Sequence, residues 1–162
     1  MPTSANYAGD YEPQGAVVLN MSQTAAIQTK GNVCVVSSGD WVKATAAAGH
    51  TAPFAVATKT STATDTTNQY IVKGIVYVKA EGAITIHSLV QCSASTAGAV
   101  AAYAASTINS TTPTGTQVIA GATDFSRVVG IYLGHENEGD GATIPTDAVD
   151  GDTGRILLAG IR

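Results

Sequence analysis

The fold of this chain is decided by one stretch, residues 71–103, which reads IVKGIVYVKAEGAITIHSLVQCSASTAGAVAAY. Apolar residues alternate over 70–80, a pattern typical of a strand with one face in a core and the other half exposed to water. The face expected to be buried consists of Tyr70, Val72, Gly74, Val76, Val78 and Ala80. Glu81-Gly82 predicts a turn, and the inward residues of the next strand are expected to be Ile84, Ile86, Ser88, Val90 and Cys92. The stretch thus predicts two consecutive strands without any grouping of residues that performs chemistry.

Short runs of β-type residues, most of them bounded by Gly, Asp, Asn, Ser or Pro, make up most of the remaining chain. Strands are expected at 16–21, 25–29, 32–37, 41–44, 54–58, 117–120, 127–133 and 155–161. Residues 99–105 stay ambiguous, because alanine favours a helix whereas the position between turns favours a strand. Roughly ten short strands predict an all-β fold, a small β-barrel or β-tulip-like body with at most one short helix.

Length and composition indicate one domain with a tail. The chain has 162 residues, of which 44% are hydrophobic and only 12% are charged. Small side chains are abundant and suit close packing of a sheet. The first 15 residues are polar, contain Pro2 and Pro13, and show no periodicity. We therefore expect a flexible N-terminal arm over 1–15 and a single β-rich domain over 16–162.

Charge and hydropathy exclude several classes of function. The net charge is −4 and no cluster of Lys or Arg is present, so binding to nucleic acid is not expected. No stretch approaches the roughly 20 apolar residues of a membrane span, and the N-terminus lacks the basic start and apolar run of a signal peptide. We expect no membrane association.

Candidate chemical groups are few. Cys34 and Cys92 each lie in a predicted strand and are expected to be buried free thiols rather than a disulfide. The three histidines, His50, His87 and His135, are scattered, and His87 is expected at the surface on the outer face of its strand. Trp41 beside a turn is expected to be a core anchor, with a sugar-binding platform as the alternative.

An acidic segment, 135–154, suggests one further site. Its acidic residues are Glu136, Glu138, Asp140, Asp147, Asp150 and Asp152. Their spacing fits no EF-hand loop, so a solvated loop is expected in preference to a calcium site. No hydrolase, phosphate-binding or dinucleotide-binding motif is present. We expect no enzyme, no metal and no cofactor.

Several short motifs together carry a family resemblance. They are Gly39-Asp40-Trp41-Val42, Val72-Lys73-Gly74-Ile75-Val76 leading into Ala83-Ile84, Thr96-Ala97-Gly98-Ala99-Val100, Ser126-Arg127-Val128-Val129-Gly130-Ile131 and Ile156-Leu157-Leu158. Over residues 33–161 this pattern resembles the capsid cement, or head decoration, proteins of tailed viruses, a family similar to the head decoration protein of phage lambda. The pattern has a glycine in the second strand where this chain has His87.

The resemblance implies a structural protein of the virion, made in the host cytoplasm. Such a protein assembles as a homotrimer on the outer surface of the capsid, at three-fold and quasi-three-fold positions. It binds the major capsid protein there and stabilises the expanded shell against the pressure of packaged DNA. A carbohydrate-binding or host-attachment domain of a fibre or tail is the alternative, because β proteins rich in Ser, Thr and Gly also serve there.

The resemblance also implies that the N-terminal arm becomes ordered on the shell and adds a strand to the major capsid protein. This segment has too little apolar area to fold alone, and strand addition would satisfy its backbone donors and acceptors. The expected capsid-binding residues of the arm are Pro2, Thr3, Ser4, Ala5, Asn6, Tyr7, Asp10, Tyr11, Glu12 and Pro13.

Overall fold

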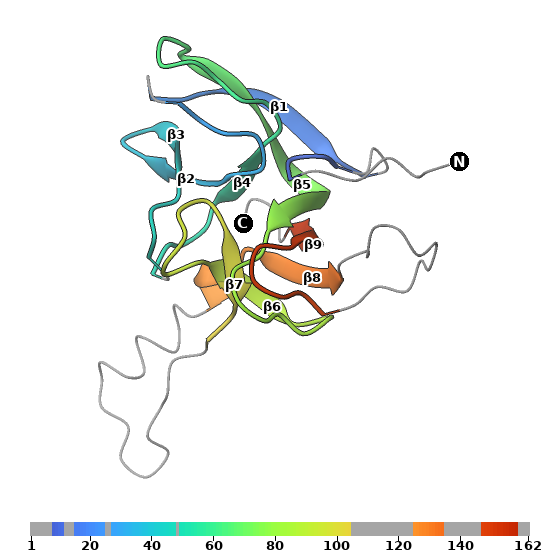
Figure 1. Cartoon of the computed structure of the whole chain (residues 1–162). Helices are drawn as coiled ribbons and strands as arrows, with labels where there is room; N and C mark the ends of the chain where they lie inside the picture. Colours follow the sequence, from blue (N-terminus) through green and yellow to red (C-terminus); the bar gives the residue numbers. More distant parts are fainter. Residues whose placement is uncertain are drawn as a thin grey trace.

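A computed structural model describes residues 8–11, 15–24, 27–47, 49–104, 125–134 and 147–158. Nine strands and one turn of 3₁₀ helix, η1 (Phe125–Arg127), form this part of the chain, which contains no α-helix (Figure 1). The strands are β1 (Val17–Ser22), β2 (Val33–Ser37), β3 (Asp40–Lys43), β4 (Phe54–Ala57), β5 (Thr67–Lys79), β6 (Leu89–Cys92), β7 (Val100–Ala102), β8 (Gly130–Gly134) and β9 (Thr153–Leu158). The predicted all-β fold is confirmed.

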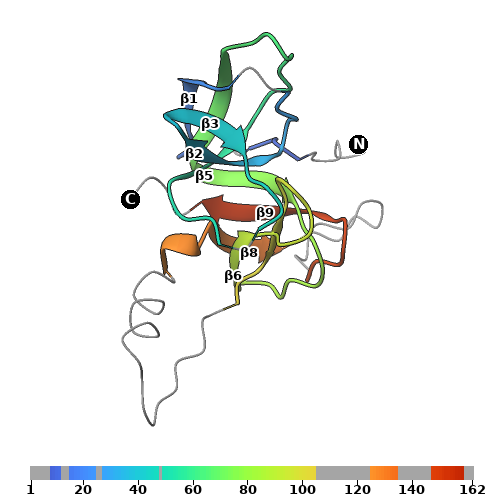
Figure 2. The ribbon, with the colours of Figure 1, turned by 90° about the vertical axis from the view of Figure 1, so that its left-hand side faces the viewer.

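The strands form one curled, antiparallel sheet with the order β3-β2-β4-β5-β9-β8-β6-β7. The long strand β5 joins its two halves: its beginning pairs with β1 and β4, and its end pairs with β9. Figure 2 shows β1, β2 and β3 on one side of β5 and β9, β8 and β6 on the other. Isolated bridges join Gln23, just after β1, to Trp41 of β3, and Ala80, just after β5, to Val100 of β7. Each half of the sheet is therefore curled so that its two outer strands meet.

Both faces are buried along the whole of β4 and over 33–35 of β2, because these segments lie between two apolar clusters. Val33, Val35, Phe54 and Val56 belong to the larger cluster, which continues across β5, β6, β8 and β9. The smaller cluster consists of Cys34, Trp41, Ala55, Ala57, Tyr70 and Val72. The ring centroids of Trp41 and Tyr70 are 5.8 Å apart, and Trp41 is only 7% exposed. Trp41 is thus a core anchor, as expected, and not a sugar platform.

The face of strand β5 that packs against the larger cluster changes at Gly74. The even-numbered residues are buried as predicted, but Ile71 and Tyr77 of the opposite face are buried too. Ile71 and Val76 both contribute to the larger cluster, although they are an odd number of residues apart. The strict alternation is interrupted at Gly74, whose φ is +115°. The odd-numbered face of β5 was expected to be half exposed to water. This expectation is wrong at Ile71 and Tyr77, because the two halves of β5 pack against different parts of the chain.

The two strands predicted around Glu81-Gly82 do not pair with each other. Strands β9 and β8 lie between β5 and β6 in the sheet. The second strand begins only at Leu89, and Ile84 forms an isolated bridge with Ala148. His87 lies in the turn between them, where the Ser88 amide donates to the Thr85 carbonyl over 3.1 Å. His87 is exposed as predicted, but it is not on the outer face of a strand.

Three other strand predictions have mixed outcomes. The ambiguous segment 99–105 contains strand β7, so its strand interpretation is confirmed over Val100–Ala102. Residues 27–29, the described part of the predicted strand at 25–29, are not a strand. The predicted strand at 117–120 lies outside the described residues.

Replacing His87 with glycine is expected to stabilise the body. The φ of His87 is +66°, and a left-handed backbone costs a non-glycine residue about 1–2 kcal/mol. Glycine loses more backbone entropy on folding, which offsets about 0.5–1 kcal/mol of that gain. His87→Gly should therefore raise the free energy of unfolding in a urea titration by about 0.5–1 kcal/mol. Thr85→Gly, two residues earlier, is the control and should lower it; equal losses in both variants would contradict the argument.

Candidate functional site

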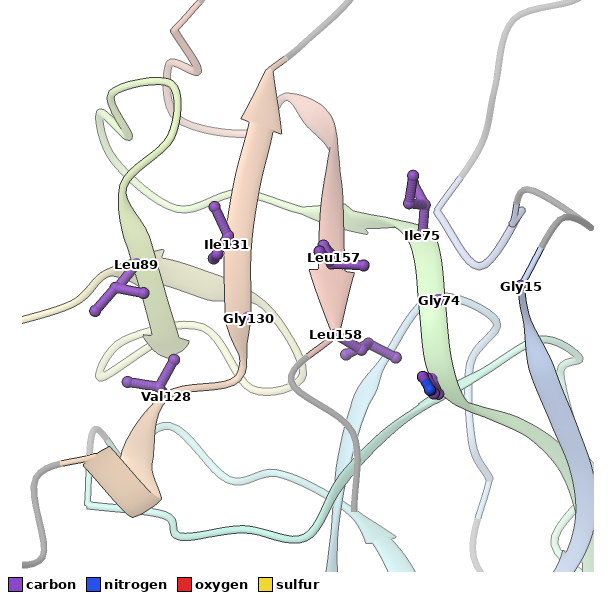
Figure 3. A pocket seen from close by; sticks show the side chains of 10 residues that line it. Gly15, Gly74, Ile75, Leu89, Val128, Gly130, Ile131, Leu157 and Leu158 are labelled. Carbon is purple, nitrogen blue, oxygen red and sulfur yellow. The ribbon is translucent and has the colours of Figure 1, made fainter. Parts of the chain in front are cut away.

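Four aliphatic side chains form a row across the outer face of the sheet. Strand register places Leu89 beside Ile131, Ile131 beside Leu157, and Leu157 beside Ile75. The row thus crosses β6, β8, β9 and β5, as Figure 3 shows, and is about 14 Å long at the usual strand spacing. Leu157 is 41% exposed and Ile131 is 37% exposed, whereas Leu89 and Ile75 are half-buried. We call these four residues the aliphatic row.

A groove of about 450 Å³ lies along the aliphatic row. It is lined in addition by Gly15, Lys73, Gly74, Val128, Gly130 and Leu158. Two of these glycines, Gly74 and Gly130, lie where the backbone passes close to a neighbouring segment. A β-carbon on Gly74 would lie 2.8 Å from the Cα of Ala16, and one on Gly130 would overlap the carbonyl of Leu157. Close strand packing therefore fixes the shape of the groove.

Lys73 is the one charged side chain among the described residues that line the groove. It is exposed and precedes Ile75 by two residues on β5. Lys30 pairs with Asp10, whereas Lys73 forms no ion pair with any of the described residues. The groove can bury apolar side chains, and Lys73 offers a positive charge at its β5 side.

The expected arm residues are placed only in part. Asp10 and Tyr11 lie along the second half of β5, where the Tyr77 amide donates to the Asp10 carbonyl over 2.8 Å. Tyr11 forms an isolated antiparallel bridge with Val76, and the Asp10 carboxylate pairs with Lys30. The remaining arm residues lie outside the described residues: Pro2, Thr3, Ser4, Ala5, Asn6, Tyr7, Glu12 and Pro13.

Residues 8–11 are therefore already attached to the body, which the sequence had predicted to begin near residue 16. Gly9 fits closely against Lys30 and Gly31, and the Gly9 amide donates to the Tyr77 carbonyl over 2.6 Å. A β-carbon on Gly31 would in turn overlap Ala8. Tight packing of small residues holds this segment, and such packing has no periodic signal in the sequence.

Both cysteines are free and buried, as predicted. Burial raises the pKa of each thiol to about 12. The Cys34 Sγ lies 3.5 Å from Oε1 of the buried Gln28. Because a protonated thiol is a poor nucleophile, neither cysteine is placed as a reactive group in the folded chain.

The described acidic residues near the C-terminus are acceptors for backbone amides. The Asp147 carboxylate accepts from the Ile86 amide over 2.7 Å. The Asp150 carboxylate accepts from the Gly82 amide over 3.1 Å, and Asp152 accepts from the Val149 amide over 2.8 Å. The first two bonds tie the loop before β9 to the loop after β5, and the third lies within the loop before β9. Across the described residues, no group of three or more His, Cys, Asp or Glu is arranged to hold a metal.

The other acidic residues of the predicted loop, Glu136, Glu138 and Asp140, lie outside the described residues, as does His135. His50 is described, and its Nε2 lies 3.1 Å from the Thr45 hydroxyl. Two hydrogen bonds from Thr62 lower the pKa of the exposed Asp65, which stabilises a surface turn.

Comparisons with protein-family models, with curated proteins and with solved structures find no match for this chain. In the ranges that the structure describes, no helix is long and apolar enough to cross a membrane. The aliphatic row with its groove is therefore the surface feature on which a function can be argued.

Proposed function

We propose that this chain is a structural virion protein that binds the outer surface of a viral capsid and stabilises the expanded shell against the pressure of packaged DNA. The observation that supports this proposal best is the aliphatic row, in which Ile131 and Leu157 are more than one-third exposed on a closely packed sheet. Contiguous exposed apolar surface on a soluble fold typically marks a site of protein interaction. The partner we propose is the major capsid protein, as the resemblance to capsid cement proteins implies.

The proposed mechanism is binding without chemistry. A protein that binds only the assembled shell stabilises it by its own binding free energy. A homotrimer at a three-fold or quasi-three-fold position contacts several capsid subunits at once, so its avidity exceeds the affinity of one contact. Strand addition by the N-terminal arm would add backbone hydrogen bonds to the same attachment.

Binding to shells is the direct test. Purified protein is mixed with undecorated expanded heads, which are then pelleted and heated. We expect the protein to pellet with the heads and to raise the temperature at which they rupture. Failure to bind, or binding without any gain in heat resistance, would contradict the proposed function.

Two truncations test the arm separately. Deleting residues 1–7 leaves the contacts of Asp10 and Tyr11 with β5 intact, whereas deleting residues 1–13 removes them. We expect the shorter deletion to keep the stability of the body and to lose attachment to heads. Normal attachment of this variant would show that the arm is not needed. The longer deletion should in addition lower the free energy of unfolding, because the Asp10–Lys30 pair is lost.

A further inference from the structure

The groove beside the aliphatic row has a size, a charge and a rigidity that together define what it can bind. We propose that it binds an extended segment of the shell protein that presents two aliphatic side chains and one carboxylate. This inference rests on the proposed function and goes further, because it names the contact surface and the chemistry of the segment bound there.

Size favours a segment over a second copy of the chain. One side of a stable protein interface buries about 800 Å², and four aliphatic side chains, two of them half-buried, present far less. The row is about 14 Å long, which matches four residues of extended chain at about 3.3 Å each. In such a segment, residues i and i+2 point to the same side, so two side chains can enter the groove together.

Charge favours an acidic segment. Lys73 lines the groove and has no ion-pair partner among the described residues. A carboxylate next to the two aliphatic side chains would pair with Lys73 at the β5 side of the groove. A basic segment would instead meet a like charge, and such repulsion contributes to the choice of partner.

Rigidity favours binding without rearrangement. The row is built on four hydrogen-bonded strands, and Gly130 brings β8 against the backbone of β9 at Leu157. Side chains in fixed register on a sheet lose little freedom when a ligand covers them, which lowers the entropic cost of binding. A short segment can therefore bind there weakly but specifically, and several copies on one shell would add their contributions.

A peptide titration tests the groove by itself. The probe is Ac-Asp-Leu-Ser-Leu-Asp-NH₂, and the control is Ac-Lys-Leu-Ser-Leu-Lys-NH₂, each added to the full chain with labelled Ile and Leu methyl groups. We expect saturating shifts at Ile131 and Leu157, with about tenfold weaker binding of the lysine peptide. Lys73→Glu should reverse that preference. Unchanged methyl signals in the row, or equal binding of both peptides, would overturn the proposal.

A binding assay on heads tests the same groove in its proposed setting. The variant carries Ile131→Ser and Leu157→Ser, and the matched control carries Ile27→Ser and Val149→Ser, which replace aliphatic residues that are 62% and 63% exposed elsewhere. Urea titration first verifies that both variants are folded. We expect the row variant to bind heads about 100-fold more weakly than the control.

The possible results separate the two proposals. If the wild-type chain binds heads and the row variant binds equally well, the groove assignment is overturned and the proposed function stands. If the wild-type chain does not bind heads, both are overturned. Selective loss in the row variant, together with charge-dependent peptide binding, supports both.

Discussion

Replacing Gly74 with alanine is expected to lower the free energy of unfolding by about 2–5 kcal/mol. The φ of Gly74 is +115°, and a left-handed backbone costs an alanine about 1–2 kcal/mol. The new β-carbon would also lie 2.8 Å from the Cα of Ala16, and forcing the backbones apart costs roughly another 1–3 kcal/mol. Urea titration followed by the fluorescence of the buried Trp41 measures the loss.

Gly82→Ala is the matched control for this substitution. Gly82 also has a positive φ, +69°, but a β-carbon there meets nothing within 4 Å. The control should lose only the free energy that the positive φ costs an alanine, about 1–2 kcal/mol. If both variants lose the same free energy, the close approach of Ala16 to β5 does not matter for stability, and the explanation of Gly74 by packing fails.

Gly74 also shows how far local sequence patterns predict this fold. Alternation over 70–80 correctly identified a strand and its even-numbered buried residues, because hydrophobic periodicity reports local geometry directly. The same pattern could not show that the strand is shared by two halves of the sheet. Burial of Ile71 on the other face follows from its pairing with Val56 of β4, which is a long-range contact.

The order of the strands in the sheet could not be predicted from local sequence patterns, for the same reason. Strands that are neighbours in sequence usually lie side by side, which would place β6 next to β5. Instead β9 pairs with β5, with Leu157 opposite Ile75. Nothing near either residue specifies this partner, because register depends on which faces must be buried together in the complete core.

The aliphatic row shows most clearly what local sequence patterns cannot predict. Each strand supplies one side chain to the aliphatic row, and Leu89, Ile131 and Leu157 are individually ordinary residues of apolar runs. They form one exposed surface only because the strand register places them side by side. The burial of Cys34 and Trp41, by contrast, was predicted, because cysteine is among the residue types most often fully buried and tryptophan is highly buried on average.

Raising the pH from 9 to 12 is expected to unfold the chain. Burial raises the pKa of both thiols, Cys34 and Cys92, from an ordinary value of 9.0 to about 12. The folded chain therefore keeps two protons that the unfolded chain releases in this range. Stability is complete below pH 9 and falls as the pH rises towards 12, by about 1.4 kcal/mol per thiol for each pH unit.

Burial also raises the pKa of Tyr70 and Tyr132, so these phenols add to the loss above about pH 10, near the ordinary pKa of tyrosine. Domains of this kind have a stability of about 5–15 kcal/mol, and the two thiols together remove about 8 kcal/mol of it between pH 9 and pH 12. The measurement is a series of urea titrations from pH 8 to 11 with a reducing agent present. The double variant Cys34→Ala with Cys92→Ala should be less stable at pH 8, since two buried side chains are shortened, but should lose stability less steeply with pH. Equal slopes in both proteins would mean that the thiols do not cause the alkaline unfolding.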